Sequence, residues 1–484
     1  MGVVIESEVW EPNNALYIIL FISCLFSIFF LPTKSVTNVV EHAPTASSIR
    51  YERNFLILYA LASVMQGLWA VFGEYELAYF GLSKEQMLTF LSVGYAVSLF
   101  IGSFLGVLSD LIGHKKLCLL FYMLHLFVTI CKIVIGTPTI WLISISLSLA
   151  SSIFSFGFET WMVVEHEKLG QRQDSLNDMF GLMTFFESAT LIGSQMVANY
   201  LIDGNVDKNI KSTWNGTVVL AVAAIVYVTR SWKEAPQIAT ISDYHISLHR
   251  HAIRVQENMV VIVDTILRTL FCCGVLDSLG PNYSDEALPL NPFNEIGYHD
   301  VEILTGSHFT KADGREVLLG LVYPCLLGSK MLGSTLFPWF FHGRFMLRIE
   351  EYLSYAFVIM GLALSVVAYD YQEIGVLVSL FCIFHACMGV VLPSLATLRT
   401  MYVPNEIRGA IMSLSLMPAN ASVLFLLVLW RQVLVMSMLQ RGYYQCIGNS
   451  TIMFCAALGL FSAAGCMFFL KKSGRQLHHS RHHL

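Results

Sequence analysis

Long runs of apolar residues constrain this chain of 484 residues more than any other feature of its sequence. A helix needs about 20 apolar residues to cross the hydrocarbon core of a bilayer, and a backbone in lipid must satisfy its own hydrogen bonds. These runs predict an all-α polytopic membrane protein. Twelve clear spans lie at 15–31, 54–73, 86–108, 117–136, 139–164, 179–202, 213–229, 316–341, 352–369, 373–398, 408–430 and 449–470.

Composition and motifs argue against other classes of protein. Apolar residues make up 55% of the chain and charged residues only 13%, whereas soluble domains carry about 25% charged residues. The sequence shows no nucleophile–base cluster, no phosphate-binding loop and no paired metal ligands, so we predict no enzymatic activity, no cofactor and no metal. The 11 cysteines are scattered without ligand spacing, and a net charge of −5 gives no reason to expect nucleic-acid binding.

The distribution of basic residues predicts the orientation of the spans, because Lys and Arg accumulate in cytoplasmic loops. Residues 1–14 contain no Lys or Arg, whereas 32–53 contain Lys34, Arg50 and Arg53. Later loops alternate between poor and rich in the same way. We therefore predict an external N-terminus and cytoplasmic basic loops. The acidic segment before the first run does not resemble the start of a signal peptide, so we interpret that run as a retained helix.

One span is anomalous. Segments 230–258 and 342–351 are both basic and therefore both predicted to be cytoplasmic. Two spans must then lie between these segments, yet only one uninterrupted apolar run is present there. The second would have to lie near 259–280, where Asp264 and Asp277 interrupt the apolar pattern.

A frame or splicing error is one explanation of this anomaly. Back-translation of Arg254 through Ser284, read in a shifted frame, can yield an aromatic membrane helix with a basic start. Residues 285–311 would then be the erroneous continuation, with the frame restored at Ala312. The alternative is a divergent helix followed by a long external loop. The short stretch 430–440 is a separate irregularity, because it looks like an insertion.

These observations divide the chain into five parts. They are an extra N-terminal helix with a cytoplasmic linker, an N-terminal six-helix bundle, a central loop with the anomalous helix, the rest of the C-terminal bundle, and a cytoplasmic tail. Their bounds are 1–53, 54–230, 231–315, 316–470 and 471–484.

A glycine-rich motif lies between the second and third spans after the leading helix. It contains Gly106, Asp110, Gly113 and Lys115 within the sequence GVLSDLIGHKK. The glycines permit close approach of helix ends, and Asp110 could cap a helix or pair with basic groups. The motif resembles the loop signature of the major facilitator superfamily, which implies a gating role for these residues and for Arg408 in the later sequence PNEIRG.

A second set of motifs narrows the resemblance. The segment from Phe156 to Lys168 reads FGFETWMVVEHEK, Lys132 lies inside its apolar span, and Pro393 begins the sequence PSL. Together with PNEIRG and the leading helix, these segments resemble the molybdate-anion transporters of the major facilitator superfamily. The resemblance covers about 15–240 and 312–470.

The resemblance implies two six-helix bundles around a central site, plus one extra N-terminal helix. It implies a secondary transporter that moves molybdate across a membrane by alternating access, in the plasma membrane or an internal membrane. Two alternatives remain open. One is a facilitator for another small solute, such as a different oxyanion or a sugar, and the other is a membrane sensor or scaffold without transport activity.

Four charged residues within the spans are candidate substrate-binding residues: Lys132, Lys330, Glu159 and Glu187. A dianion in the low-dielectric membrane requires donors or cations near mid-membrane. Each lysine could supply this charge, and either carboxylate could couple transport to protons by taking one up. The alternatives are structural. Lys132 could extend to the membrane interface, and Lys330 could form an ion pair with a buried carboxylate. Glu159 could simply form an ion pair with Lys132 or Lys330.

The residues around Lys330 suggested room for a substrate. Gly328 and Gly333 lie close to Lys330 on its span. Because glycine has no side chain, we expected these positions to let a solute approach the helix backbone.

Overall fold

The computed structural model describes most of the membrane-spanning part of the chain. The described residues are 12–29, 46–82, 84–135, 140–170, 173–202, 206–231, 260–268, 319–342, 348–369, 374–425, 427–428 and 449–481. The described parts of the twelve clear spans predicted from the sequence are helical, apart from Tyr369 at the end of one span and a turn at Ser415 and Leu416 within the span 408–430.

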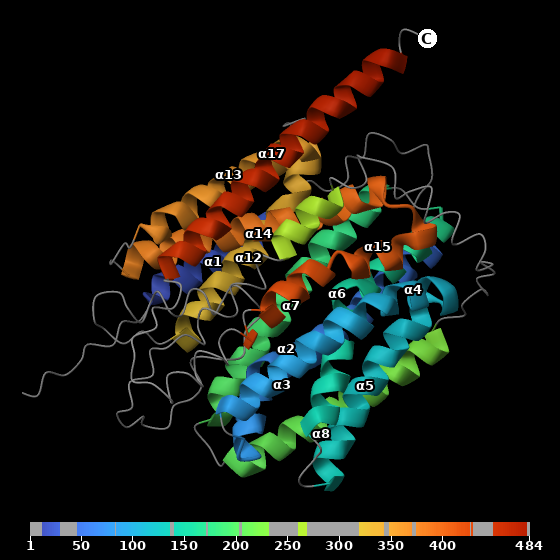
Figure 1. Ribbon diagram of the computed structural model, residues 1–484, viewed down its shortest axis with the longest axis vertical. Coiled ribbons are helices and arrows are strands. Elements are labelled where there is room, and N and C mark those ends of the chain that lie inside the picture. The colour runs from blue at the N-terminus through green and yellow to red at the C-terminus, as the bar shows by residue number, and fades with distance from the viewer. Residues whose placement is uncertain are drawn as a thin grey trace, which may run out of the picture.

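One leading helix and the helices of the N-terminal half come first along the chain. They are α1 (Asn14–Phe29), α2 (Ala46–Tyr79), α3 (Lys84–Val97), the π-helix η2 (Ser98–Gly102), α4 (Ser103–Ile112), α5 (His114–Ile135), α6 (Ile140–Lys168), α7 (Gln173–Ile202) and α8 (Val206–Ser231). Figure 1 shows α2 to α8, coloured blue to green, gathered on one side of the molecule.

The C-terminal half lies against them. Its helices are α12 (Leu319–His342), α13 (Ile349–Ala368), α14 (Ile374–Tyr402), the 3₁₀ turn η5 (Asn405–Ile407), α15 (Arg408–Leu414) and α17 (Asn449–Arg481). In Figure 1 the yellow-to-red helices α12, α13, α14 and α17 lie together, while α15 crosses to the other half and packs on α4. Helix α7 lies between the halves and packs on both α2 and α12.

Each half has its own apolar core. The core of the N-terminal half is built around aromatic side chains such as Phe55, Phe121 and Trp161, all at most 1% exposed. The core of the C-terminal half centres on α13, α14 and α17, with Phe357 and Phe381 buried between them. Two separately packed halves are the arrangement that lets one half move against the other.

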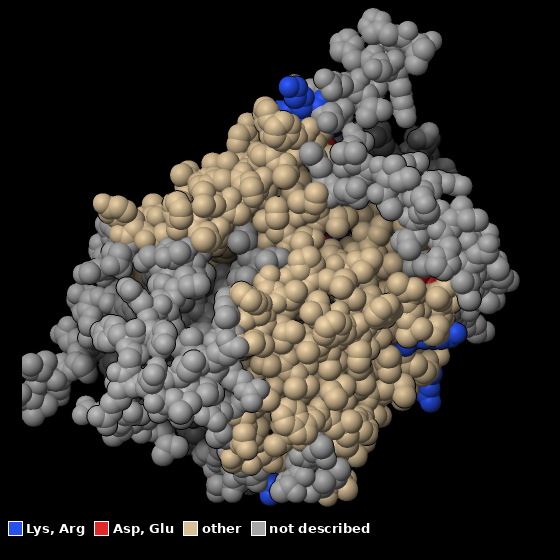
Figure 2. Space-filling view, viewed as in Figure 1, with Lys and Arg blue, Asp and Glu red and all other residues tan. Residues whose placement is uncertain are grey.

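The outer surface fits a lipid environment. Eight of the described helices are long and apolar enough to cross a membrane. Figure 2 shows one face of the molecule, on which Lys and Arg lie at the margins of the described surface. Large apolar side chains such as Phe100, Phe104 and Val134 are exposed, from 65% to 74%. This outward-facing apolar surface is what helices facing hydrocarbon require.

Helix α1 packs against α12 of the C-terminal half. The hydroxyl of Ser27 donates a hydrogen bond to Thr335, and the indole nitrogen of Trp339 donates to the carbonyl oxygen of Ser27 at 3.3 Å. The described part of the leading apolar run is thus a helix that packs on α12, and its place outside a twelve-helix core stays a prediction.

The anomalous region is only partly described. Residues 260–268 are helical, and Asp264 is 3% exposed and forms ion pairs with Arg268 at 2.8 Å and Arg399 at 2.7 Å. The rest of the anomalous region and the stretch 430–440 lie outside the described residues. The frame-error hypothesis therefore stays a prediction.

Candidate functional site

A cavity of about 440 Å³ lies between the two halves. Helices α2, α3, α6 and α7 line one side, and α12 and α14 line the other, so both halves contribute. Three of the four predicted substrate-binding residues line it: Glu159, Glu187 and Lys330. The fourth, Lys132, is not among its lining residues.

Glu187 and Lys330 connect the two halves across the cavity. Lys330 Nζ, on α12, donates to Oε1 of Glu187, on α7, at 3.2 Å. The phenol of Tyr59, on α2, donates to the other carboxylate oxygen at 3.2 Å. The side chains of Lys330 and Glu187 are 14% and 30% exposed, so this ion pair is accessible from the cavity.

Glu159 has a different partner from the one expected. The sequence suggested Lys132 or Lys330, but the guanidinium of Arg399, on α14, binds both carboxylate oxygens of Glu159 at 2.9 and 2.6 Å. Such two-point pairing is geometrically specific and strong. Arg399 was missed because it lies near the end of an apolar span, where a basic residue is ordinarily assigned to the interface.

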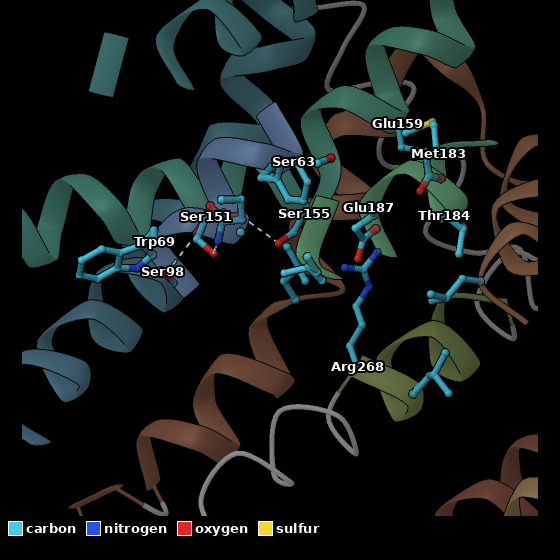
Figure 3. A pocket seen from close by; sticks show the side chains of 18 of the residues that line it. Ser63, Trp69, Ser98, Ser151, Ser155, Glu159, Met183, Thr184, Glu187 and Arg268 are labelled. Carbon is cyan, nitrogen blue, oxygen red and sulfur yellow. Dashed lines mark hydrogen bonds between the residues drawn. The ribbon is translucent and has the colours of Figure 1, made fainter. Parts of the chain in front are cut away.

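Hydroxyl and aromatic side chains form the wall supplied by the N-terminal half. Figure 3 shows Ser63 and Ser155 toward Glu187, and Ser151 closer to Trp69 and Ser98 on one side of the cavity. The serines of this wall were not singled out from the sequence, because serine is common in packed membrane helices. The serines lining the cavity are Ser63, Ser98, Ser144, Ser148, Ser151, Ser152 and Ser155.

Lys132 lies outside the cavity in a cluster of its own. Its ammonium group forms an ion pair with Glu76 of α2, and both side chains are almost fully buried. The alternative that Lys132 extends to the membrane interface is not what the structure shows, because its charge is paired inside the N-terminal half. The sequence did not single out Glu76.

The glycines around Lys330 make room for helices and not for a solute. A Cβ on Gly333 would overlap the carbonyl oxygen of Ala386, and one on Gly389 would overlap that of Lys330. Gly328 faces Leu20 of α1. Our expectation of open space beside Lys330 was therefore wrong at these positions, because Gly333 and Gly389 admit a close crossing of α12 with α14 and Gly328 packs against α1.

The glycine-rich motif joins the two halves at the predicted cytoplasmic end. The carboxylate of Asp110, on α4, accepts hydrogen bonds from the backbone N–H groups of Gly409 and Ala410, both at 2.9 Å. These groups belong to the first turn of α15, where an anionic side chain is stabilised by unpaired N–H groups and the helix dipole. Gly106 contacts Gly409 so closely that any side chain there would overlap its backbone.

The other predicted gating residues flank this contact. Gly113 ends α4 with φ at 115°, a conformation that favours glycine. Arg408 is 1% exposed and donates to Asn405 Oδ1 and the carbonyl oxygen of Val403, both at 2.8 Å, so it stabilises the turn before α15. Lys115 follows on α5, next to the same end.

Further contacts between the halves lie nearby. Gln173 donates to Thr400 at 2.7 Å, and Thr397 donates to Asn177 at 3.0 Å. Together with Asp110, these contacts hold the predicted cytoplasmic ends of the two halves together below the cavity.

The sequence matches a model of a protein family described as sugar transporters with twelve transmembrane segments. The match covers residues 16–279, more than half of the 484-residue chain. The chain belongs to this family. It is therefore an integral multi-pass membrane protein and a secondary transporter of the major facilitator type, not an enzyme, and it moves a small solute. The predicted superfamily is confirmed, whereas the narrower molybdate branch stays a prediction.

Solved structures show the same fold. A bacterial homologue of the iron transporter ferroportin, in an outward-facing state, has a TM-score of 0.62 at 12% identity, covering 87% of this chain and 99% of that one. The human organic anion transporter TETRAN has a TM-score of 0.57 at 11% identity, covering 86% of this chain and 99% of that one. At these identities the likeness concerns the fold alone. No curated protein matched the chain by sequence.

Proposed function

We propose that this chain transports molybdate, or a closely similar tetrahedral oxyanion, by alternating access, with Lys330 as the cation that binds the anion. The resemblance of its motifs to those of the molybdate-anion transporters supports the substrate. The charges that line the cavity support the role of Lys330. In this scheme α1 is an additional helix outside the twelve-helix core.

The observation that carries the proposal is the contrast between the two ion pairs that cross the cavity. Arg399 is held by two short bonds to Glu159 and its side chain is 8% exposed. Lys330 has one longer bond, at 3.2 Å, to a carboxylate that is 30% exposed. An incoming anion can replace Glu187 at Lys330 far more easily than it can replace Glu159 at Arg399.

Proton uptake by Glu187 would couple this exchange to a proton gradient. A protonated Glu187 no longer attracts Lys330 as an anion does, so the ammonium group becomes free to bind the solute. Tyr59 lies on the other side of the same carboxylate and would still reach it. The oxyanion and the proton would then cross together, which makes the net charge that moves less negative.

A neutral hydroxylated solute, such as a sugar, is the second candidate. The wall with seven serines and the aromatic residues Trp69 and Phe90 offers hydrogen bonds and ring faces without net charge. The Asp, Glu, Lys and Arg residues that line the cavity also balance, because Glu159, Glu187 and Asp264 face Lys330, Arg268 and Arg399. The description of the family agrees with this reading.

Uptake competition tests the two candidates. Cells deficient in molybdate uptake that express the chain should accumulate molybdenum, measured by mass spectrometry, at low external molybdate. Tungstate should compete strongly and glucose should not compete. Accumulation that glucose suppresses, or no accumulation above that of cells without the protein, would contradict the proposal.

A further inference from the structure

The Lys132–Glu76 pair is a buried charged cluster that the transport scheme does not use. Glu76 is 5% exposed and Lys132 is 6% exposed. The second oxygen of Glu76 accepts a hydrogen bond from the indole nitrogen of Trp214, on α8, at 2.7 Å. A buried ion pair is expensive to desolvate and is weak evidence for stability on its own. The other contacts of this pair therefore indicate what role it has.

Trp69 is the residue that connects this cluster to the cavity. Lys132 Nζ lies 4.7 Å from the centre of the Trp69 ring, within the distance at which a cation is attracted to an indole face. Gly73 lies one turn further along α2, and a Cβ there would meet three ring atoms at 3.1 Å. The ring thus rests on a glycine and is held by a cation whose own position is fixed by Glu76.

The indole N–H of Trp69 has no hydrogen-bond acceptor among the described residues. By contrast, the indole N–H of Trp214 bonds to Glu76, and that of Trp339 bonds to the carbonyl oxygen of Ser27. Trp69 lines the cavity, and Figure 3 places its indole on the same side as Ser98. An indole N–H can only donate, so the partner that completes it must supply an acceptor atom.

Trp69 lies at a different depth from Lys330. Tyr59, which bonds to Glu187 and so marks the level of Lys330, lies ten residues earlier on α2. At 1.5 Å per residue this separation is about 15 Å along the helix. A small tetrahedral anion therefore contacts one level at a time. Because the later part of α2 runs toward the predicted external side, the level of Trp69 is reached first from outside.

We propose that Trp69 forms an outer subsite for the transported oxyanion, in which its indole N–H donates to an oxygen atom of the anion. Lys132 and Glu76 are positioning residues that hold the ring toward the cavity. The inference rests on the proposed function, because an oxyanion is the acceptor. It adds a solute-contacting residue and an order of binding, with Trp69 before Lys330.

The test compares molybdate uptake kinetics in matched tryptophan variants, at equal surface abundance. Trp69→Phe removes the N–H and keeps an aromatic ring, and we expect KM for molybdate to rise about tenfold with Vmax within about twofold, as for a lost hydrogen bond to an anion. Trp339→Phe is the matched control, because its N–H bonds outside the cavity, and its KM should equal that of the wild type.

The positioning role is tested through Lys132. Lys132→Arg keeps both the pairing with Glu76 and a cation over the ring, so its KM should stay close to that of the wild type. The double variant Glu76→Gln with Lys132→Met leaves no unpaired charge, so it keeps the fold testable. Its KM should rise as in Trp69→Phe, because the ring loses the cation that holds it toward the cavity.

Several results would overturn the inference. Unchanged KM in Trp69→Phe would remove the outer subsite while leaving the proposed function intact. A wild-type KM in the double variant would remove the positioning role. If the wild-type protein accumulates no molybdate, both the proposed function and this subsite fail. If Lys330→Met transports normally while Trp69→Phe raises KM, the subsite stands and the role of Lys330 fails.

Discussion

Among the described residues, the Lys330–Glu187 and Lys132–Glu76 pairs each join two apolar helices, and they differ in which helices they connect. Lys330 and Glu187 join α12 to α7 across the boundary between the halves, with side chains 14% and 30% exposed. Lys132 and Glu76 join α5 to α2 inside the N-terminal half, with side chains 6% and 7% exposed. The first pair can separate when a solute enters the cavity. The second cannot separate without leaving a buried charge unpaired.

In the proposed scheme, burial and the elements that each pair connects, and not residue type, distinguish the binding role of Lys330 from the positioning role of Lys132. Both lysines have the same charge and similar apolar neighbours in the sequence. A pair across a moving boundary gains function by being easy to exchange, whereas a pair within one rigid half gains function by staying fixed.

The largest effect, on the stability of the protein, should come from breaking the Lys132–Glu76 pair. Lys132→Met leaves the Glu76 carboxylate buried with only Trp214 as a described partner, and removing one member of a buried pair costs about 3–5 kcal/mol. We expect a marked fall in surface abundance and in the melting temperature of the purified protein. Adding Glu76→Gln should restore both. A single variant as stable as the wild type would show that the pair is open to water.

Breaking the Lys330–Glu187 pair should instead reduce transport and leave the stability of the protein nearly unchanged. Lys330→Met leaves Glu187, which is partly exposed and keeps its bond from Tyr59, so we expect near-normal surface abundance. Molybdate uptake should fall about 100-fold, because an anion in the cavity loses its charged donor, worth about 1.5–3 kcal/mol. Lys330→Arg should keep partial uptake, since the charge survives in a different shape.

A matched control separates loss of charge from loss of a lysine. Lys471, on α17, pairs with Glu351, on α13, at 2.8 Å and does not line the cavity. Lys471→Met should transport as the wild type does. If Lys330→Met takes up molybdate with unchanged KM and Vmax, Lys330 is only a structural partner of Glu187.

The sequence predicted much of this fold and only part of its site. Apolar runs fixed the positions of the spans, because burial in lipid imposes a length and a composition. Lys330, Glu187 and Glu159 were identified because a charged residue deep in such a run is costly and therefore informative. Lys330 and Glu187 pair with each other. The partner of Glu159, which is Arg399, and the partner of Lys132, which is Glu76, were not identified, because they come from distant spans and no spacing rule links helices that meet only in three dimensions.

The glycines near Lys330 show the same limit of prediction from the sequence. Gly333 and Gly389 lie 56 positions apart in the sequence, yet they meet where α12 crosses α14. From the sequence, a glycine beside Lys330 was equally compatible with a solute or with a helix. Only the packing decides between these two readings.

A smaller effect should appear at the other contact between the halves. Asp110→Asn removes the negative charge that faces the first turn of α15, an interaction worth about 0.3–2 kcal/mol. We expect Vmax for molybdate to fall by up to about thirtyfold with KM little changed, because the residue does not line the cavity and is proposed to bias the movement of the halves. Unchanged Vmax at equal surface abundance would remove Asp110 from the gate. Lys168→Met, which breaks an exposed pair with Glu165, is the control.

The smallest effect concerns the pH dependence that Glu187 is proposed to confer. In the wild-type protein a proton on Glu187 frees Lys330, so uptake should rise as the external pH falls. Glu187→Gln imitates the protonated carboxyl at every pH and leaves Lys330 free, so its uptake should depend little on external pH. The difference in uptake rate between acidic and alkaline conditions should shrink to about threefold or less, under 1 kcal/mol.

Initial rates of molybdate uptake across a series of external pH values, at fixed membrane potential, give this comparison. Glu165→Gln, which changes a half-buried carboxylate outside the cavity, should keep the wild-type profile. A Glu187→Gln variant that retains the full pH dependence would place the coupling proton elsewhere and leave the Lys330–Glu187 pair as a binding element alone.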